Sequence, residues 1–147
     1  MLSLVSCVSF NQSQSSEEKY IGKLTLFQKE KSFNYNFAIF PSENIFIIQV
    51  NKPLLGNVLN VKIDKFNGVS TSPAPDIKTV AFINNLNVDD FFTFISNCLR
   101  SNISENSLIS FNQDKTNFDC EKRKEMATLI TIKFENIYIK GVISDYK

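Results

Sequence analysis

The sequence predicts an α+β fold: an antiparallel β-meander or sandwich-like sheet packed with about two helices, in a single domain. Three observations predict this class. The chain has 147 residues, which is near the usual size of one domain. Hydrophobic residues make up 43% of it, with fourteen Phe, which is enough to build one core. Short β-rich runs follow one another between turn residues, and one segment has the period of an amphipathic helix.

The whole chain, residues 1–147, is predicted to form this one domain. Its opening segment Leu2–Phe10 has the pattern of a short strand. The polar Ser/Gln/Glu stretch that follows, Asn11–Lys19, is predicted to be a flexible loop.

A meander is expected next in the chain. The first strand is Gly22–Gln28. Two β-rich runs, Asn34–Phe40 and Asn44–Val50, are separated by Pro41-Ser42-Glu43, a connection short enough to make them antiparallel neighbours. A partly alternating run, Asn57–Lys65, extends this hairpin to a third strand.

The middle of the chain is predicted to contain a loop and two further strands. Val69–Asp76 holds two prolines with Ser and Thr, so we expect a surface loop. Ile77–Ile83 then resumes a strand pattern, and Leu108–Phe111 is a further short strand.

The clearest helix is predicted over Val88–Arg100. Asn87 can cap it, and Asp89 and Asp90 at one end and Arg100 at the other have the signs that the helix dipole favours. One continuous apolar face is formed by Val88, Phe91, Phe92, Ile95, Cys98 and Leu99.

The C-terminal part allows two interpretations. Asp119–Met126 is polar and compatible with a helix. The residues after it alternate between apolar and polar, which favours a hairpin of Thr128–Phe134 with Ile137–Ile143.

Several function classes lack their usual residues. The chain has no histidine, which removes the commonest general base and most zinc sites. Its four glycines are far apart, so no phosphate-binding loop can form. Sixteen basic against fifteen acidic residues give a net charge of +1, so the charge gives no indication of a nucleic-acid partner. We therefore predict no catalytic, cofactor-binding or metal-binding residues, no cofactor and no small-molecule ligand, and the partner-binding residues stay unknown.

Three features could be taken for sites and are interpreted as structural. Asp89 and Asp90 are consecutive, so on a helix they diverge by about 100° and cap the dipole. The basic run Lys122-Arg123-Lys124 lies between two glutamates, as on a solvated face. The phenylalanines, which could stack on bases, sit in core-like patterns instead: Phe37, Phe46, Phe82, Phe91 and Phe92.

The three cysteines, Cys7, Cys98 and Cys120, are predicted to be reduced thiols, because their number is odd and their spacing is long. Met1–Phe10 has no basic region and is a poor secretory signal. Leu4-Val5-Ser6-Cys7 is similar to a lipoprotein cleavage box, but the apolar segment that should precede it is missing. No stretch approaches the roughly 20 apolar residues of a membrane helix. A cytoplasmic or nuclear location without membrane contact is expected.

The order of elements resembles the small proteasome-assembly chaperones. Three stretches carry the resemblance: FNYNFAIFPSENIFIIQVNKPLLGNVLNVKI as the opening meander, IKTVAFINN as the strand before the first helix, and ENSLISFNQDKTNFDCEKRKEMATLI as the last strand and C-terminal helix. The resemblance covers about Phe33–Phe134 and rests on element order and hydrophobic spacing. It implies a C-terminal helix near Asn117–Phe134, against the hairpin that the alternation favours.

The resemblance also implies a function. It predicts a non-enzymatic chaperone that forms a heterodimer with a similar-sized subunit, binds α-type subunits of the proteasome and assists assembly of the α-ring. The alternative is a small dimeric scaffold of the roadblock or longin kind in trafficking or signalling, because a meander with helices is common to both.

Overall fold

The computed structural model describes residues 19–72, 86–99, 107–123 and 127–146. Within these residues the chain forms nine strands and one helix. The elements are β1 (Tyr20–Gln28), β2 (Lys31–Pro41), β3 (Ile45–Lys52), β4 (Gly56–Asp64), β5 (Gly68–Ser72), α2 (Val88–Leu99), β6 (Leu108–Gln113), β7 (Thr116–Lys122), β8 (Thr128–Phe134) and β9 (Ile137–Tyr146).

All nine strands belong to one antiparallel sheet, in the order β5-β4-β3-β2-β1-β9-β8-β7-β6. Every neighbouring pair is also consecutive in sequence except β1 and β9, which join the two ends of the described chain. The sheet therefore consists of two meanders, β1 to β5 and β6 to β9, which are joined where β1 pairs with β9. Its edge strands are β5 and β6, and α2 lies between them in sequence.

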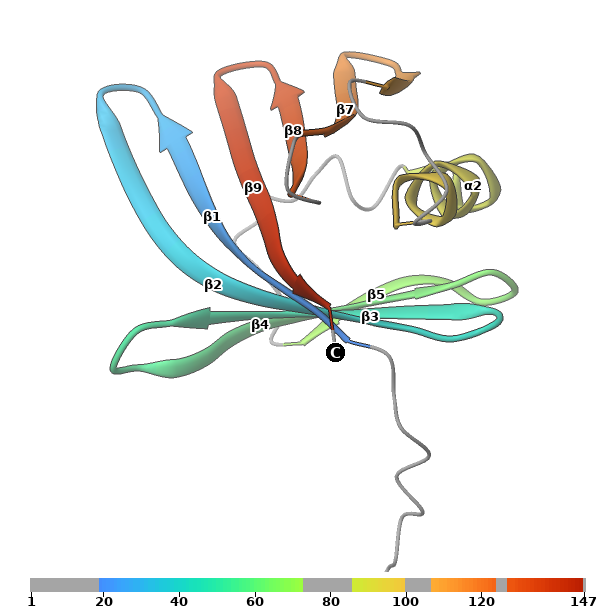
Figure 1. Cartoon of the computed structure of the whole chain (residues 1–147), viewed down its shortest axis with the longest axis horizontal. Coiled ribbons are helices and arrows are strands. Elements are labelled where there is room, and N and C mark those ends of the chain that lie inside the picture. The colour runs from blue at the N-terminus through green and yellow to red at the C-terminus, as the bar shows by residue number, and fades with distance from the viewer. Residues whose placement is uncertain (1–18, 73–85, 100–106, 124–126, 147) are drawn as a thin grey trace, which may run out of the picture.

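The sheet is strongly bent and α2 lies in the bend (Figure 1). In that view β1, β2 and β9 rise on one side, β3, β4 and β5 run across the bottom, and α2 lies between this lower layer and β7. The helix packs with both β4 and β6, so it links strands from both meanders.

Alternation of apolar side chains fixes which face of the sheet meets the helix. Phe46 is opposite Ile63 and Phe118 is opposite Ile132, so apolar residues of neighbouring strands fall on one face. The buried core cluster combines this face with one side of α2: Phe37, Ile39, Phe46, Val61, Ile63, Phe91, Phe92, Phe94, Ile95, Cys98, Leu99, Phe118, Cys120 and Ile143.

The helix has the predicted N-terminal cap. The Asn87 side-chain oxygen accepts a hydrogen bond from the Asp90 backbone N–H at 3.3 Å, and the Asn87 carbonyl accepts one from Phe91 N–H at 3.0 Å. The Gln113 side-chain oxygen accepts a hydrogen bond from the Asn87 N–H at 2.6 Å. The Tyr20 hydroxyl donates a hydrogen bond to the Leu99 carbonyl at 3.2 Å. Both ends of α2 are thus tied to the sheet.

Several predicted elements are confirmed. The strand Gly22–Gln28, the hairpin of Asn34–Phe40 with Asn44–Val50, and the third strand Asn57–Lys65 correspond to β1 to β4. The helix Val88–Arg100 corresponds to α2 and the strand Leu108–Phe111 to β6.

Other predictions are wrong or untested. The surface loop Val69–Asp76 is wrong over residues 69–72, which form β5 against β4. Leu2–Phe10, the loop Asn11–Lys19 except its last residue, and Ile77–Ile83 lie outside the described residues.

The α+β prediction with about two helices is wrong, because one sheet with one helix makes up the described part of the chain. The error arises in the C-terminal helix near Asn117–Phe134, which is replaced by β7 and β8. The polar residues before Met126 are compatible with a helix. Pairing of β7 with β6 and β8 stabilises a strand there instead. The hairpin of Thr128–Phe134 with Ile137–Ile143, which the alternation favoured, is confirmed.

The prediction of reduced cysteines is wrong for Cys98 of α2 and Cys120 of β7, which form a disulfide, while Cys7 lies outside the described residues. Their Cα atoms are 5.9 Å apart although 22 residues separate them in sequence. Sequence spacing did not show this proximity, which arises only when α2 packs against the sheet. Closing a loop of this length stabilises a fold by about 3 kcal/mol.

Gly22 of β1 sits where two features crowd the backbone. A β-carbon at this position would lie 2.3 Å from the Val142 carbonyl oxygen and 2.6 Å from the Phe37 ring. The register of β1 on β9 also shifts between Ile21 and Gly22. The Phe37 ring also lies over Gly141, but there a β-carbon would be 3.5 Å away, an ordinary contact.

We expect Gly22→Ala to lower the free energy of unfolding by about 1–3 kcal/mol, because the added methyl group must displace backbone or the buried Phe37 ring. Urea unfolding followed by circular dichroism would measure the loss. Gly141→Ala is the matched control and should leave stability nearly unchanged. Equal losses in both variants would contradict this account of Gly22.

Candidate interaction surface

The turn between β3 and β4 exposes two leucines at its end. Leu54 is 105% exposed and Leu55 is 71% exposed. They follow Pro53, which is also exposed, and we call residues Pro53, Leu54 and Leu55 the leucine tip. Fully exposed large apolar side chains that lie next to each other are typical of sites that bind another apolar surface.

The backbone of the leucine tip holds Leu54 in a conformation that L-residues rarely adopt. The Leu55 N–H donates to the Lys52 carbonyl at 3.1 Å, which closes a turn with Pro53 at its second position. Leu54, at the third position, has φ of +71°. This is the type II pattern, in which Gly or Asn normally takes the third position. A leucine there costs about 1–2 kcal/mol, so Leu54 lowers the stability of the free protein.

Other turns of the sheet use the same backbone region with polar residues. Lys29, Asp114 and Glu135 have φ of +56°, +50° and +48°, and all are exposed. Among the positive-φ residues of the described chain that are not glycine, Leu54 alone is apolar. The fold therefore does not require a leucine at such a turn, and Leu54 needs another explanation.

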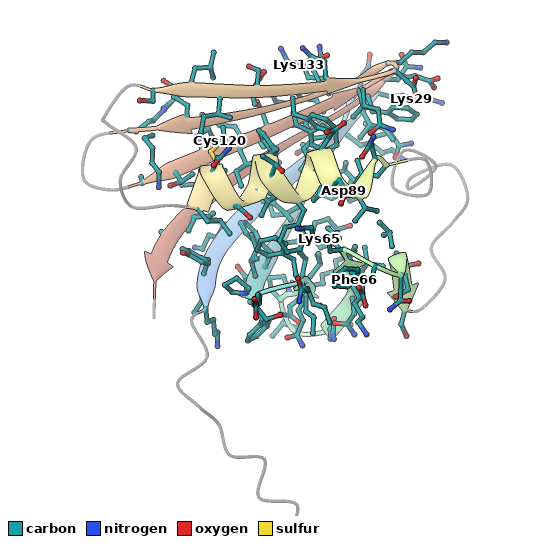
Figure 2. The ribbon with its side chains drawn as sticks, turned by 90° about the vertical axis from the view of Figure 1, so that its right-hand side faces the viewer. Lys29, Lys65, Phe66, Asp89, Cys120 and Lys133 are labelled. Carbon is teal, nitrogen blue, oxygen red and sulfur yellow. A yellow bond between two sulfur atoms is a disulfide. The ribbon has the colours of Figure 1, made fainter. Side chains whose placement is uncertain are left out.

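A second exposed apolar residue, Phe66, lies in the turn between β4 and β5 and is 77% exposed. Asp64 fixes this turn: its carboxylate accepts hydrogen bonds from the Phe66 N–H at 2.9 Å, the Asn67 N–H at 3.3 Å and the Asn67 side-chain amide at 3.0 Å. Figure 2 places Phe66 beside Lys65, below the helix. β4 lies between this turn and the leucine tip, so the two exposed groups are at opposite ends of that strand.

These hydrogen bonds lower the pKa of Asp64. The Asn67 side-chain amide is the largest cause and the Phe66 backbone N–H the next, while burial opposes them. Asp64 is 7% exposed, yet it keeps its charge because three donors surround it.

The residues considered as sites from the sequence do not come together. Asp89 and Asp90 are exposed in the first turn of α2, as the dipole interpretation predicted. Of the basic run, Lys122 is half-buried, which lowers its pKa, while Arg123 is exposed and lies 3.8 Å from Glu121. Lys124 lies outside the described residues.

Four of the five phenylalanines that the sequence assigned to the core lie in the described residues, and all four belong to the core cluster. Phe37, Phe46, Phe91 and Phe92 are all buried, and the Phe46 and Phe92 ring centroids are 4.4 Å apart. Phe82 lies outside the described residues. This confirms the structural interpretation for those four side chains.

Sequence reasoning missed the leucine tip. The signal that could have found it is a pair of leucines enclosed by Pro53 and Gly56, because turns at that place in a hairpin are normally polar.

Within the described residues, no group of three or more Cys, Asp or Glu side chains could hold a metal ion. In the same part of the chain, α2 falls short of the length that a bilayer crossing needs. No protein-family model and no curated protein matches this chain. The resemblance to proteasome-assembly chaperones is thus untested, and it stays a prediction.

Leu54→Asn should raise the free energy of unfolding by about 0.5–1 kcal/mol, because asparagine adopts positive φ more easily than leucine. For a domain of this size the melting temperature should rise by about 1–4 °C. Leu55→Asn is the control, since no positive φ is relieved there and no gain is expected. A loss of stability in Leu54→Asn would show that the leucine supports the fold.

Asp64→Asn should destabilise the protein near neutral pH. The folded-state pKa of Asp64 lies below its ordinary value of 3.8, so its charge stabilises the fold above that value and the contribution is lost as pH falls below it. The gap between wild type and variant in urea unfolding should therefore shrink below pH 3.8. A gap that stays constant with pH would rule out the charge as the cause.

Proposed function

We propose that this chain is a non-enzymatic protein-binding domain that inserts Leu54 and Leu55 into an apolar pocket of a partner protein. The observation that carries the proposal is the leucine tip: two exposed leucines, one of them held at φ of +71°. Backbone strain persists at positions where function maintains it, and it is a reason to suspect a function there.

The chemistry of the tip favours a protein over a lipid surface. Anchoring in a membrane interface relies on aromatic residues and clusters of basic residues. The turn from Lys52 to Asn57 contains no aromatic residue and a single lysine. Two leucines with one flanking positive charge fit a pocket that is apolar inside and bears acidic groups at its rim.

The leucine tip can anchor an interface without forming the whole of it. Stable interfaces bury roughly 800 Å² on each partner, or 20–30 residues a side. The convex side of β3 continues from the tip, where Ile47 is 37% exposed. This strand is the natural extension of the contact, because its outer residues lie on the opposite face from the α2 core.

The proteasome-assembly role remains a separate prediction. It was drawn from an order of elements that included a C-terminal helix, and β7 and β8 occupy that place. Heterodimer formation with a similar subunit and binding of proteasome α-type subunits depend on the same resemblance. The cytoplasmic or nuclear location was expected from the predicted thiols, the poor secretory signal and the lack of a membrane-length apolar stretch. The roadblock or longin alternative also stays a prediction; it was argued from a meander with helices, and the described residues form two joined meanders with one helix.

Site-specific photo-crosslinking in the native cell tests the proposal. A photoactivatable residue at Leu55 should give one reproducible crosslinked protein. The same residue at Glu135, an exposed position in the turn between β8 and β9, should not give it. The identified partner should bind the purified chain, and Leu54→Asn with Leu55→Asn should weaken binding at least about tenfold through lost apolar burial.

The control for binding is Lys29→Asn, which changes another exposed residue of positive φ and should leave affinity unchanged. Equal affinity of wild type and the double variant would overturn the proposal. Binding of the wild-type chain to lipid vesicles, lost in the double variant, would replace the protein partner with a membrane.

A further inference from the structure

The disulfide between Cys98 and Cys120 lies inside the core. Cys98 is 0% exposed and Cys120 is 1% exposed, and both belong to the main core cluster. Figure 2 shows Cys120 beside one end of α2, with Asp89 at the other end. The bond therefore joins the C-terminal half of the helix to β7, while the Gln113 side chain holds its N-terminal end.

We infer that this disulfide is a permanent structural bond and that the protein matures and acts in an oxidising compartment, outside the reducing cytosol. Structural disulfides form and persist in oxidising compartments and are rare in the cytosol. Cytosolic disulfides are typically transient, catalytic or redox-sensing, and such cysteines are accessible to partners. The two buried sulfurs of this chain lack that access.

Formation of the bond requires an oxidant of defined class. The two thiols lose two protons and two electrons as the S–S bond forms. An exchangeable disulfide of an oxidoreductase accepts the electrons and protons and becomes a dithiol. Exchange proceeds by thiolate attack on sulfur, which requires access to the sulfur atoms. It must therefore occur before α2 packs against β7 and buries both cysteines. Afterwards, a reductant reaches the bond only when the helix leaves the sheet.

The disulfide removes one of the grounds for a cytoplasmic location. That location was expected because Met1–Phe10 is a poor secretory signal, because no stretch is long enough for a membrane helix, and because an odd number of widely spaced cysteines indicated reduced thiols. The ground that the disulfide removes is the one that rests on the three cysteines. Two of the three are now paired, and Cys7 lies outside the described residues. If the proposed function also holds, the partner of the leucine tip is a protein of the same oxidising compartment.

The first test measures the state of the cysteines in the native cell. Cells are quenched in acid, free thiols are alkylated, and peptides of the full chain are analysed without reduction. Cys98 and Cys120 should be recovered linked to each other, and each should become alkylated only after reduction. Recovery of both as alkylated thiols without reduction would overturn the inference.

The second test distinguishes a structural bond from a redox switch. Under native conditions a mild dithiol should leave the bond intact, whereas the same reagent in urea should reduce it. Rapid reduction of the folded protein would overturn the structural assignment. Cys98→Ala with Cys120→Ala should lower the melting temperature by about 6–12 °C. An unchanged melting temperature in the double variant would also contradict it.

Neither readout involves Leu54 or Leu55. Failure of the leucine tip to bind a partner would leave the cysteine results untouched. Reduced cysteines in the native cell would remove the compartment inference and leave the binding proposal standing.

Discussion

The pairing of β1 with β9 is the interaction on which the rest of the structure depends. It joins the meander β1 to β5 to the meander β6 to β9, and without it the described chain would form two separate small sheets. Gly22 lies in this seam, where the backbone approaches too closely for a side chain and the Phe37 ring fills the space above. The seam therefore leaves no room for a β-carbon at this position.

The bend of the joined sheet determines where α2 can lie. A helix between the two edge strands in sequence covers the concave face and buries its phenylalanines there. The Cys98–Cys120 disulfide and the hydrogen bonds of Gln113 and Tyr20 hold it in place. Because the helix packs its apolar side into this face, the chemistry available to a partner is concentrated in the turns and on the convex side.

At the leucine tip, Leu54 lowers the stability of the free protein and is not buried within the described chain. Elsewhere in the described residues, positive φ falls on glycine or on an exposed lysine, aspartate or glutamate. At Leu54 the backbone is strained and the side chain gains no burial within the chain. A partner that buries the side chain would recover free energy that folding alone does not.

The sequence by itself determined β1 to β4, α2 and β6, because apolar alternation and the helical period act over a few residues. It also indicated the β8–β9 hairpin through Ile130, Ile132 and Phe134, although the resemblance pointed to a helix. Tertiary structure alone decided β7, the β1–β9 seam, the disulfide and the exposure of the leucine tip. The seam and the disulfide depend on contacts between residues far apart in sequence. β7 depends on pairing with strands on both of its sides, and the exposure of Leu54 depends on the absence of a packing partner in the described residues. Local pattern holds no information about any of these.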